Sequence, residues 1–120
     1  MAKKNLLLDT IIEGILEKKG REIIDIDLTK IRSTICDHFI ICHADSTTQV
    51  NAIADSVEKR VKEQVKITVG HREGLENAIW ILLDYYDIVV HIFQKETREY
   101  YRLEELWGDA RISRIEESFN

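Results

Sequence analysis

The stretch AIWILLDYYDIVVHIF, residues 78–93, decides the fold of this chain. It contains two apolar runs, AIWILL at 78–83 and IVVHIF at 88–93, which are separated by the four residues DYYD at 84–87. Apolar runs of this length, bounded by a short break, are typical of two β-strands joined as a hairpin. The sequence therefore predicts an antiparallel pair of strands at this position.

The first run of this hairpin is apolar on both of its faces. Successive side chains of a strand point to opposite sides, so Ile79, Ile81 and Leu83 share one face. Trp80 and Leu82 share the other face. One face can pack on helices, whereas the second must be covered either by a two-sided core or by another protein.

Hydrophobic periodicity predicts further elements on both sides of the hairpin. Ser46 and Gln49 have the spacing of a capping box, which is typical of the start of a helix. The predicted elements are a helix over 3–19, strands over 23–28 and 35–43, a helix from 46 to about 64, a strand over 65–69 and, beyond the hairpin, a helix over 96–107.

The order of these elements predicts an α/β fold. The strand over 35–43, the helix after it and the strand over 65–69 form a βαβ unit, whose strands are parallel and whose crossover is right-handed. With the antiparallel hairpin this gives a mixed five-stranded sheet with flanking helices. A single domain is assigned to residues 1–110, because 120 residues leave room for one core. Residues 111–120 are interpreted as a tail, loosely held from Gly108 onward.

The acidic balance of the composition favours a basic protein partner or no charged partner at all. The chain has 17 Lys and Arg against 22 Asp and Glu, a formal net charge of −5. Proteins that grip nucleic acid by its phosphates carry a basic stripe, so direct nucleic-acid readout is not expected. With two cysteines, no signal peptide and no apolar run near the roughly 18 residues of a membrane span, we expect a soluble cytoplasmic protein.

Four potential metal ligands, Cys36, His38, Cys42 and His43, are close in the sequence. They fall within one predicted strand, where Cys36 and Cys42 lie about 20 Å apart and cannot share one tetrahedral zinc ion. His43 points to the opposite face from the other three. We therefore expect neither a metal site nor a cofactor.

Asp25 and Asp27 provide the strongest argument for an enzyme. Two carboxylates at this spacing share one face of a strand, as in sheet enzymes that hold Mg²⁺ and transfer nucleotides. That chemistry also needs a third carboxylate and a glycine-rich turn, yet no glycine follows the strand until Gly70. A solvated strand end is the simpler interpretation. No G-x-S-x-G motif is present either, so we expect no enzyme.

Aromatic residues are concentrated in the C-terminal half. Seven of the nine aromatic residues fall within residues 80–107. Trp and Tyr are favoured anchors at protein interfaces, because they combine a large apolar surface with a polar group. The concentration indicates either a two-sided core or a surface that docks onto another protein.

Several of these segments resemble the ribosome silencing factor family, also called RsfS or Iojap-related. The resemblance rests on WILLDYYDIVVHIF at 80–93 and REYYRLEELWGDA at 98–110. DHFIIC at 37–42, STTQ at 46–49 and the pair Glu73-Gly74 follow the family's order. The resemblance covers about residues 4–110 and implies a nucleotidyltransferase-like fold without the catalytic apparatus.

The resemblance also implies a function. Members bind the large ribosomal subunit through ribosomal protein L-fourteen and sterically block joining of the small subunit, which represses translation. An assembly role for the large subunit at the same site is the alternative. An exposed apolar face predicts a homodimer when the protein is free. The family's partner-binding positions correspond to Trp80, Leu82, Tyr85, Asp87, His91, Phe93 and Tyr101.

Two positions depart from the family pattern. Tyr86 stands where the family usually has a glycine in the hairpin turn, and Ala44-Asp45 stands where it usually has one before the second helix. A turn that needs a positive φ disfavours tyrosine, so we expect the hairpin to adopt another turn type.

Overall fold

Strands β4 (Trp80–Asp84) and β5 (Ile88–Gln94) form the predicted antiparallel hairpin, in which Trp80 lies opposite Phe93 and Asp84 opposite Val89. The structure is a computed structural model that describes residues 3–31 and 36–116. The confirmed hairpin lies inside a larger sheet, so both of its faces contribute to the core.

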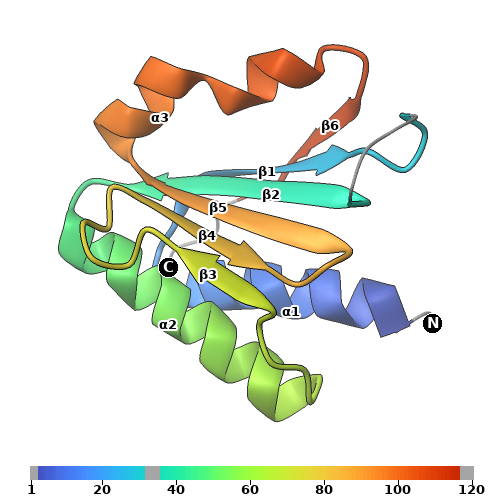
Figure 1. Ribbon diagram of the computed structural model, residues 1–120, viewed down its shortest axis with the longest axis horizontal. Coiled ribbons are helices and arrows are strands. Elements are labelled where there is room, and N and C mark those ends of the chain that lie inside the picture. The colour runs from blue at the N-terminus through green and yellow to red at the C-terminus, as the bar shows by residue number, and fades with distance from the viewer. Residues whose placement is uncertain (1–2, 32–35, 117–120) are drawn as a thin grey trace.

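The sheet is mixed and has six strands in the order β3-β4-β5-β2-β1-β6, one more than predicted. Helices α1 and α2 pack on one face, and α3 with the 3₁₀ helix η1 lies over the other (Figure 1). The predicted α/β class is confirmed. The remaining elements are α1 (Lys3–Glu17), β1 (Arg21–Asp27), β2 (His38–Ala44), α2 (Thr47–Gln64), β3 (His71–Glu73), α3 (Lys95–Tyr101), η1 (Leu103–Trp107) and β6 (Arg111–Arg114).

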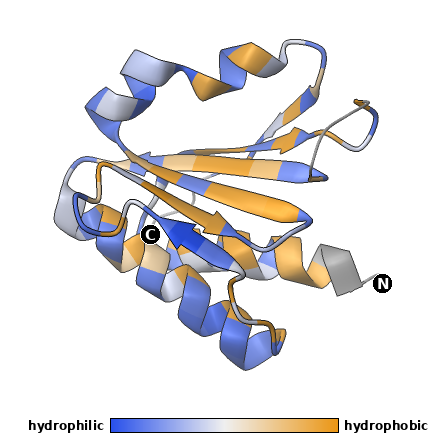
Figure 2. Ribbon diagram, viewed as in Figure 1, coloured by the Kyte–Doolittle hydropathy of each residue, from blue (hydrophilic) through white to orange (hydrophobic). Residues whose placement is uncertain are grey.

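Two hydrophobic clusters lie on opposite sides of the sheet. Ile81 and Leu83 of β4 join the cluster beneath α1 and α2, whereas Trp80 and Leu82 join the other, as the alternation predicts. Figure 2 shows the central strands as largely hydrophobic and the outer side of α2 as largely hydrophilic. Within the described residues, no helix has the length and apolar character needed to cross a membrane.

Helix α2 begins as its sequence predicts. Ser46 is its N-cap, and the Ser46 hydroxyl accepts a 3.1 Å hydrogen bond from the main-chain N–H of Gln49. The Gln49 side chain donates instead to the carbonyl of Lys18, which ties the start of α2 to the end of α1. The two helices pack closely at Gly14, whose carbonyl accepts a 2.8 Å hydrogen bond from the Ser56 hydroxyl.

The hairpin turn has a left-handed residue, which the presence of tyrosine at position 86 was expected to prevent. Tyr86 has φ +72°, so the prediction of another turn type is wrong. The Asp84 side chain accepts a 2.7 Å hydrogen bond from the Tyr86 N–H, which stabilises the turn locally. The Tyr86 ring lies against Gly70, where a Cβ would be 2.6 Å from Cζ of the ring.

The predicted strand over 65–69 does not form. Val65 is the C-cap of α2, while Ile67 and Val69 pack against the core without pairing in the sheet. Burial of alternate side chains therefore explains the pattern. The parallel partner of β2 is β5, from His38 opposite Ile88 to Ala44 opposite Gln94. The crossover consequently includes α2, β3 and β4.

The C-terminal region also differs from its prediction. The helix expected over 96–107 breaks at Arg102, which has φ +46° and separates α3 from η1. Residues 111–114 form β6, which pairs antiparallel with β1, so the expectation of a loosely held tail is wrong for this segment. All four side chains of β6 are exposed, and main-chain pairing rather than burial defines the strand.

Candidate functional site

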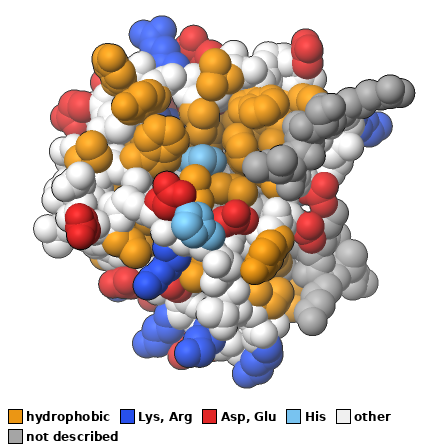
Figure 3. All heavy atoms as spheres, in the orientation of Figure 1, with side chains coloured by type: hydrophobic (Ala, Val, Ile, Leu, Met, Phe, Trp, Pro, Cys, Tyr) orange, Lys and Arg blue, Asp and Glu red, His pale blue; other side chains and the backbone are white. Residues whose placement is uncertain are grey.

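The sheet face opposite α1 and α2 carries most of the aromatic side chains, and we call it the aromatic face. It combines residues from β2, β4 and β5 with residues from α3 and η1. Its members are Phe39, Trp80, Leu82, His91, Phe93, Tyr101, Leu103 and Trp107. Figure 3 shows hydrophobic side chains gathered over the part of the surface where α3 and η1 lie across the sheet.

The rings of this face form a continuous network. Trp80 lies 4.7 Å from Phe93 and 5.0 Å from Tyr101, measured between ring centroids. Phe39 makes edge contacts with His91 at 4.8 Å and with Trp107 at 5.7 Å. Such geometries are favourable for aromatic pairs, so these contacts stabilise the face.

His91 is the polar centre of the aromatic face. Its Nδ1 accepts a 3.1 Å hydrogen bond from the Trp80 indole, which places the imidazole proton on Nε2. Burial lowers the pKa of His91 to about 4, so the ring is neutral near pH 7. Nε2 is buried and has no hydrogen-bond partner in the described part of the chain.

The expected partner-binding residues occupy three different environments. Trp80 and Leu82 are half-buried, Tyr101 is 52% exposed, and Asp87 is exposed at the hairpin tip. These side chains can be reached from solvent. The site also includes three residues that are not among the positions implied by the family resemblance, namely Phe39, Leu103 and Trp107. For Phe39, alternation with the buried Ile41 along β2 is a signal that could have revealed it.

Three of the expected residues are buried. His91 is 5% exposed and Phe93 is fully buried, so both support the aromatic face from beneath. Tyr85 is 3% exposed and packs in the cluster on the helix side of the sheet. This position corrects the expectation that Tyr85 lies on the docking surface, because alternation along the chain places Tyr85 on the same side of the sheet as Ile81 and Leu83, opposite Trp80.

A buried arginine holds α3 over the sheet. Nη1 of Arg98 donates to the carbonyl of Glu22 at 2.7 Å and lies 3.0 Å from Nδ1 of His43, which accepts. Glu22 has φ +45° at a β-bulge in β1, where the strand register shifts. Nη2 of Arg98 donates to Glu104 at 3.4 Å. Burial and the neighbouring Arg98 lower the pKa of His43.

Each of the paired aspartates is hydrogen-bonded to a neighbouring side chain. His38 donates from Nδ1 to Asp25 at 2.8 Å, and this bond raises the pKa of His38. Thr29 donates to Asp27 from its hydroxyl at 2.6 Å and from its N–H at 2.9 Å, which lowers the pKa of Asp27. In residues 3–31 and 36–116, no three metal-ligating side chains cluster.

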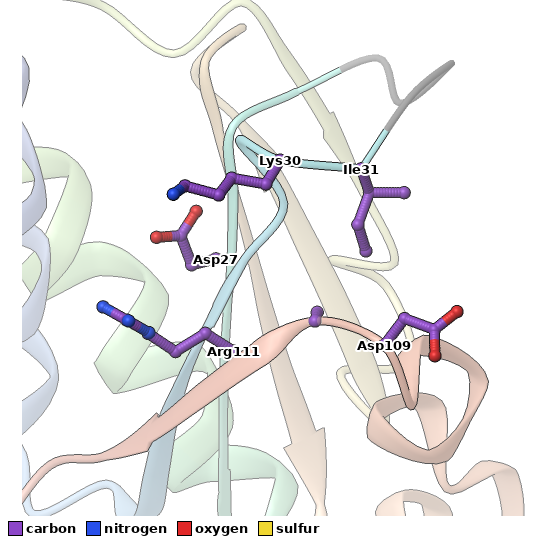
Figure 4. A pocket seen from close by; sticks show the side chains of 6 residues that line it. Asp27, Lys30, Ile31, Asp109 and Arg111 are labelled. Atoms are coloured by element: carbon purple, nitrogen blue, oxygen red, sulfur yellow. The ribbon is translucent and has the colours of Figure 1, made fainter.

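A pocket of about 380 Å³ lies beside Asp27. Lys30 and Arg111 extend on the same side as the Asp27 carboxylate, whereas the Asp109 carboxylate points away (Figure 4). Two cationic side chains, Lys30 and Arg111, therefore line the same pocket as Asp27.

The two cysteines and two histidines between residues 36 and 43 do not come together in one site within the described residues. Cys36 precedes β2 and packs in the cluster of the aromatic face, whereas Cys42 packs beneath the helices. The prediction that the two thiols share one face is therefore wrong. Burial raises the pKa of Cys36 to about 11. His38 and His43 are bonded to Asp25 and Arg98, respectively.

The fold and site define a small α/β domain that carries helices on one sheet face and a network of rings on the other. The family model described as "Ribosomal silencing factor during starvation" (RsfS) matches residues 2–120. A protein of Halalkalibacterium halodurans named "Ribosomal silencing factor RsfS" is 42% identical over 110 residues, which cover 92% of each chain. The chain belongs to the RsfS family, and the resemblance seen in its sequence is confirmed.

Two further similarities agree with this assignment. An X-ray structure of a protein from Chromobacterium violaceum has a TM-score of 0.83 at 33% identity, covering 98% of this chain and 97% of that one. A mouse protein named "Mitochondrial assembly of ribosomal large subunit protein 1" is 30% identical over 108 residues, which cover 83% of this chain and 44% of the mouse protein.

Proposed function

We propose that this protein binds the large ribosomal subunit through ribosomal protein L-fourteen and sterically blocks joining of the small subunit, so that translation is repressed in the cytoplasm. The observation that carries the proposal is the aromatic face. Its half-buried Trp80 and Leu82 and its exposed Tyr101 offer apolar surface that the folded chain leaves accessible. Membership of the RsfS family supports the ribosome as the partner.

The docking contacts are assigned by exposure. Trp80, Leu82 and Tyr101 contact the partner directly, and Asp87 contributes a charge at the hairpin tip. His91 and Phe93 support these residues from beneath. Tyr85 is excluded, because its ring lies on the helix side of the sheet.

Charge around the face favours a basic partner. The exposed charges on α3, on η1 and at the position after Gly108 are net negative, with four acidic side chains against two basic ones: Glu96, Glu99, Glu105 and Asp109 against Lys95 and Arg102. Acidic groups around an apolar centre increase the association rate with a basic surface and select against acidic ones. Stable docking needs a buried area of about 1,000 Å² or more, with a few aromatic anchors supplying most of the free energy.

The proposed role requires binding without catalysis. Asp25 and Asp27, the candidates for metal chemistry, are engaged by His38 and Thr29. We also propose that the free protein forms a homodimer through the aromatic face, since partly exposed rings favour self-association. Sedimentation equilibrium tests this point: a dimer that binds large subunits without dissociating would exclude an overlap of the two interfaces.

The decisive experiment follows subunit joining by sedimentation. Purified protein is mixed with separated ribosomal subunits, and the fraction that joins is measured with wild type, Trp80→Ala and Lys59→Ala. Lys59 is exposed on α2, on the opposite side of the sheet, and serves as the control. We expect wild type and Lys59→Ala to block joining and a folded Trp80→Ala to bind about tenfold more weakly or worse. Undiminished joining at saturating wild-type protein contradicts the proposal.

A role in assembly of the large subunit is the second candidate. The name of the mouse relative, which refers to assembly of the ribosomal large subunit, favours it. Both roles use the same surface, so depletion of the protein from cells separates them. Accumulation of large-subunit precursors indicates assembly, whereas normal subunits with unrepressed translation during starvation indicate silencing.

A further inference from the structure

Part of the aromatic face lies beneath η1, residues Leu103–Trp107, which we call the cover. The cover is held at both ends. On one side α3 is fixed by the buried Arg98, and on the other β6 pairs with β1. Between these attachments the cover crosses the sheet over β2, where Trp107 contacts Phe39.

The cover packs through few side chains. Leu103 and Trp107 are half-buried against the aromatic face, whereas Glu105 and Leu106 are exposed, Leu106 to 71%. None of its residues is fully buried. A segment with so little burial is released at a lower free energy than the strands beneath it.

Hydrogen bonds are left unmade where the cover meets the sheet. Four buried side-chain polar atoms lack a partner in the described part of the chain. Two of them belong to the cover, Nε1 of Trp107 and Oε1 of Glu104, and a third is Nε2 of His91. His91 and Trp107 both contact the Phe39 ring. A buried polar group without a hydrogen-bond partner costs free energy, so these atoms lower the stability of the closed arrangement.

The backbone provides a point about which the cover can turn. Arg102 is both the C-cap of α3 and the N-cap of η1, and it adopts a left-handed conformation with φ +46°. Non-glycine residues hold this conformation only where the surroundings enforce it. The N–H of Glu105 donates to the Arg102 carbonyl at 3.0 Å, so the first turn of the cover begins at this residue.

We infer that η1 is a displaceable cover that regulates docking: it moves away from the sheet between its two caps, Arg102 and Gly108, when a protein partner binds, and it thereby uncovers the Phe39 ring for that partner. This inference rests on the proposed docking function. The partner contributes an apolar side chain that takes the place of Trp107 against Phe39.

Opening of the cover can be measured on the free protein. Hydrogen exchange followed by NMR compares the main-chain N–H of Glu105, which is hydrogen-bonded within the cover, with the amide N–H of Val90 in β5, each relative to its unprotected rate. We expect the protection of the Glu105 N–H to be at least about a hundredfold smaller, because opening is local. Equal protection of the two groups would mean that the cover opens only on global unfolding, and would overturn the inference.

Binding supplies the second test. Trp107→Ala weakens the closed cover, whereas Leu106→Ala removes an exposed side chain of the same segment and is the matched control. With purified large ribosomal subunits as the probe, we expect Trp107→Ala to bind about three- to tenfold more tightly than wild type, and Leu106→Ala to be unchanged. Leu103→Ala replaces Trp107→Ala if the latter does not fold.

The outcomes separate the two proposals. Failure of wild-type protein to bind large subunits contradicts the proposed function, while the exchange measurement still decides whether the cover opens. Binding by wild type, with equal or weaker binding by Trp107→Ala and Leu103→Ala, overturns the cover and leaves the docking function intact.

Discussion

Arg98 on α3 donates a 2.7 Å hydrogen bond to the main-chain carbonyl of Glu22 on β1. The same guanidinium bonds to His43 and Glu104, and the residue is 6% exposed. One side chain therefore joins the first strand, the second strand and the segment that borders the aromatic face.

Replacement of this arginine tests that link. Arg98→Met keeps the apolar stem but leaves the Glu22 carbonyl and the Glu104 carboxylate without their donor. We expect the free energy of unfolding to fall by about 2 to 4 kcal/mol. Urea denaturation measures the change, with Arg102→Met as the control, because Arg102 is exposed and its pair with Glu105 contributes little. Similar effects for the two variants would contradict the anchoring role.

Stability is expected to fall below neutral pH because of His91. Its pKa is lowered from 6.5 to about 4 by burial, so the unfolded chain binds a proton that the folded chain excludes. The contribution of neutral His91 to the free energy of unfolding is fully present above pH 6.5 and is lost as the pH falls toward 4. The full loss is on the order of 3 kcal/mol. His43, whose pKa is also lowered, acts in the same direction.

The pH prediction is tested with urea denaturation at pH 7.5 and 5. His91→Gln retains an acceptor for the Trp80 indole but does not titrate. The difference between the free energies of unfolding at the two pH values is therefore expected to shrink by about 2 kcal/mol in this variant. His38 acts in the opposite sense, because its raised pKa gives stability that is present below pH 6.5 and lost as the pH rises. An unchanged difference in His91→Gln would assign the acid sensitivity to other groups.

The contact between α1 and α2 makes Gly14 sensitive to substitution. A Cβ at Gly14 would lie 2.9 Å from the Cα of Val57, too close for either backbone to accept. Gly14→Ala is expected to lower the free energy of unfolding by about 1 to 3 kcal/mol, despite the higher helix propensity of alanine. Gly108→Ala is the control, since nothing lies within 4 Å of its added Cβ. Equal thermal midpoints for the two variants would contradict close helix packing.

The hairpin turn offers a stabilising substitution. Tyr86 has φ +72° and is 70% exposed, so glycine relieves the backbone strain while little apolar burial is lost. Tyr86→Gly is expected to raise the free energy of unfolding by about 0.5 to 1 kcal/mol, as measured by urea denaturation. A decrease would mean that the contact of the ring with Gly70 outweighs the strain.

The sequence predicts those elements that local chemistry defines. Alternation of apolar residues gives the hairpin and its two faces, and Ser46 gives the start of α2. The strand over 65–69 fails, because the same alternation arises wherever Val65 and Ile67 pack on a core without pairing. Strand β6 is missed for the opposite reason, since its exposed side chains carry no pattern of burial.

The site is predictable to a similar extent. Trp80 and Leu82 are found on the expected face because both lie in a regular strand. Tyr85 is misplaced, because its assignment came from the family resemblance, whereas alternation from Ile81 and Leu83 places it on the helix side of the sheet. The contacts of Arg98 and Trp107 join segments far apart in the chain, and no local pattern encodes them.

The pairing of β1 with β6 has a consequence for biosynthesis. During translation, β1 emerges early, but its outer neighbour is residues 111–114, which are made near the end of the described chain. Until then the edge of β1 offers unsatisfied main-chain groups to any neighbouring polypeptide, a recognised route to aggregation. A nascent chain of this protein is therefore expected to need protection by chaperones until residues 111–114 have left the exit tunnel.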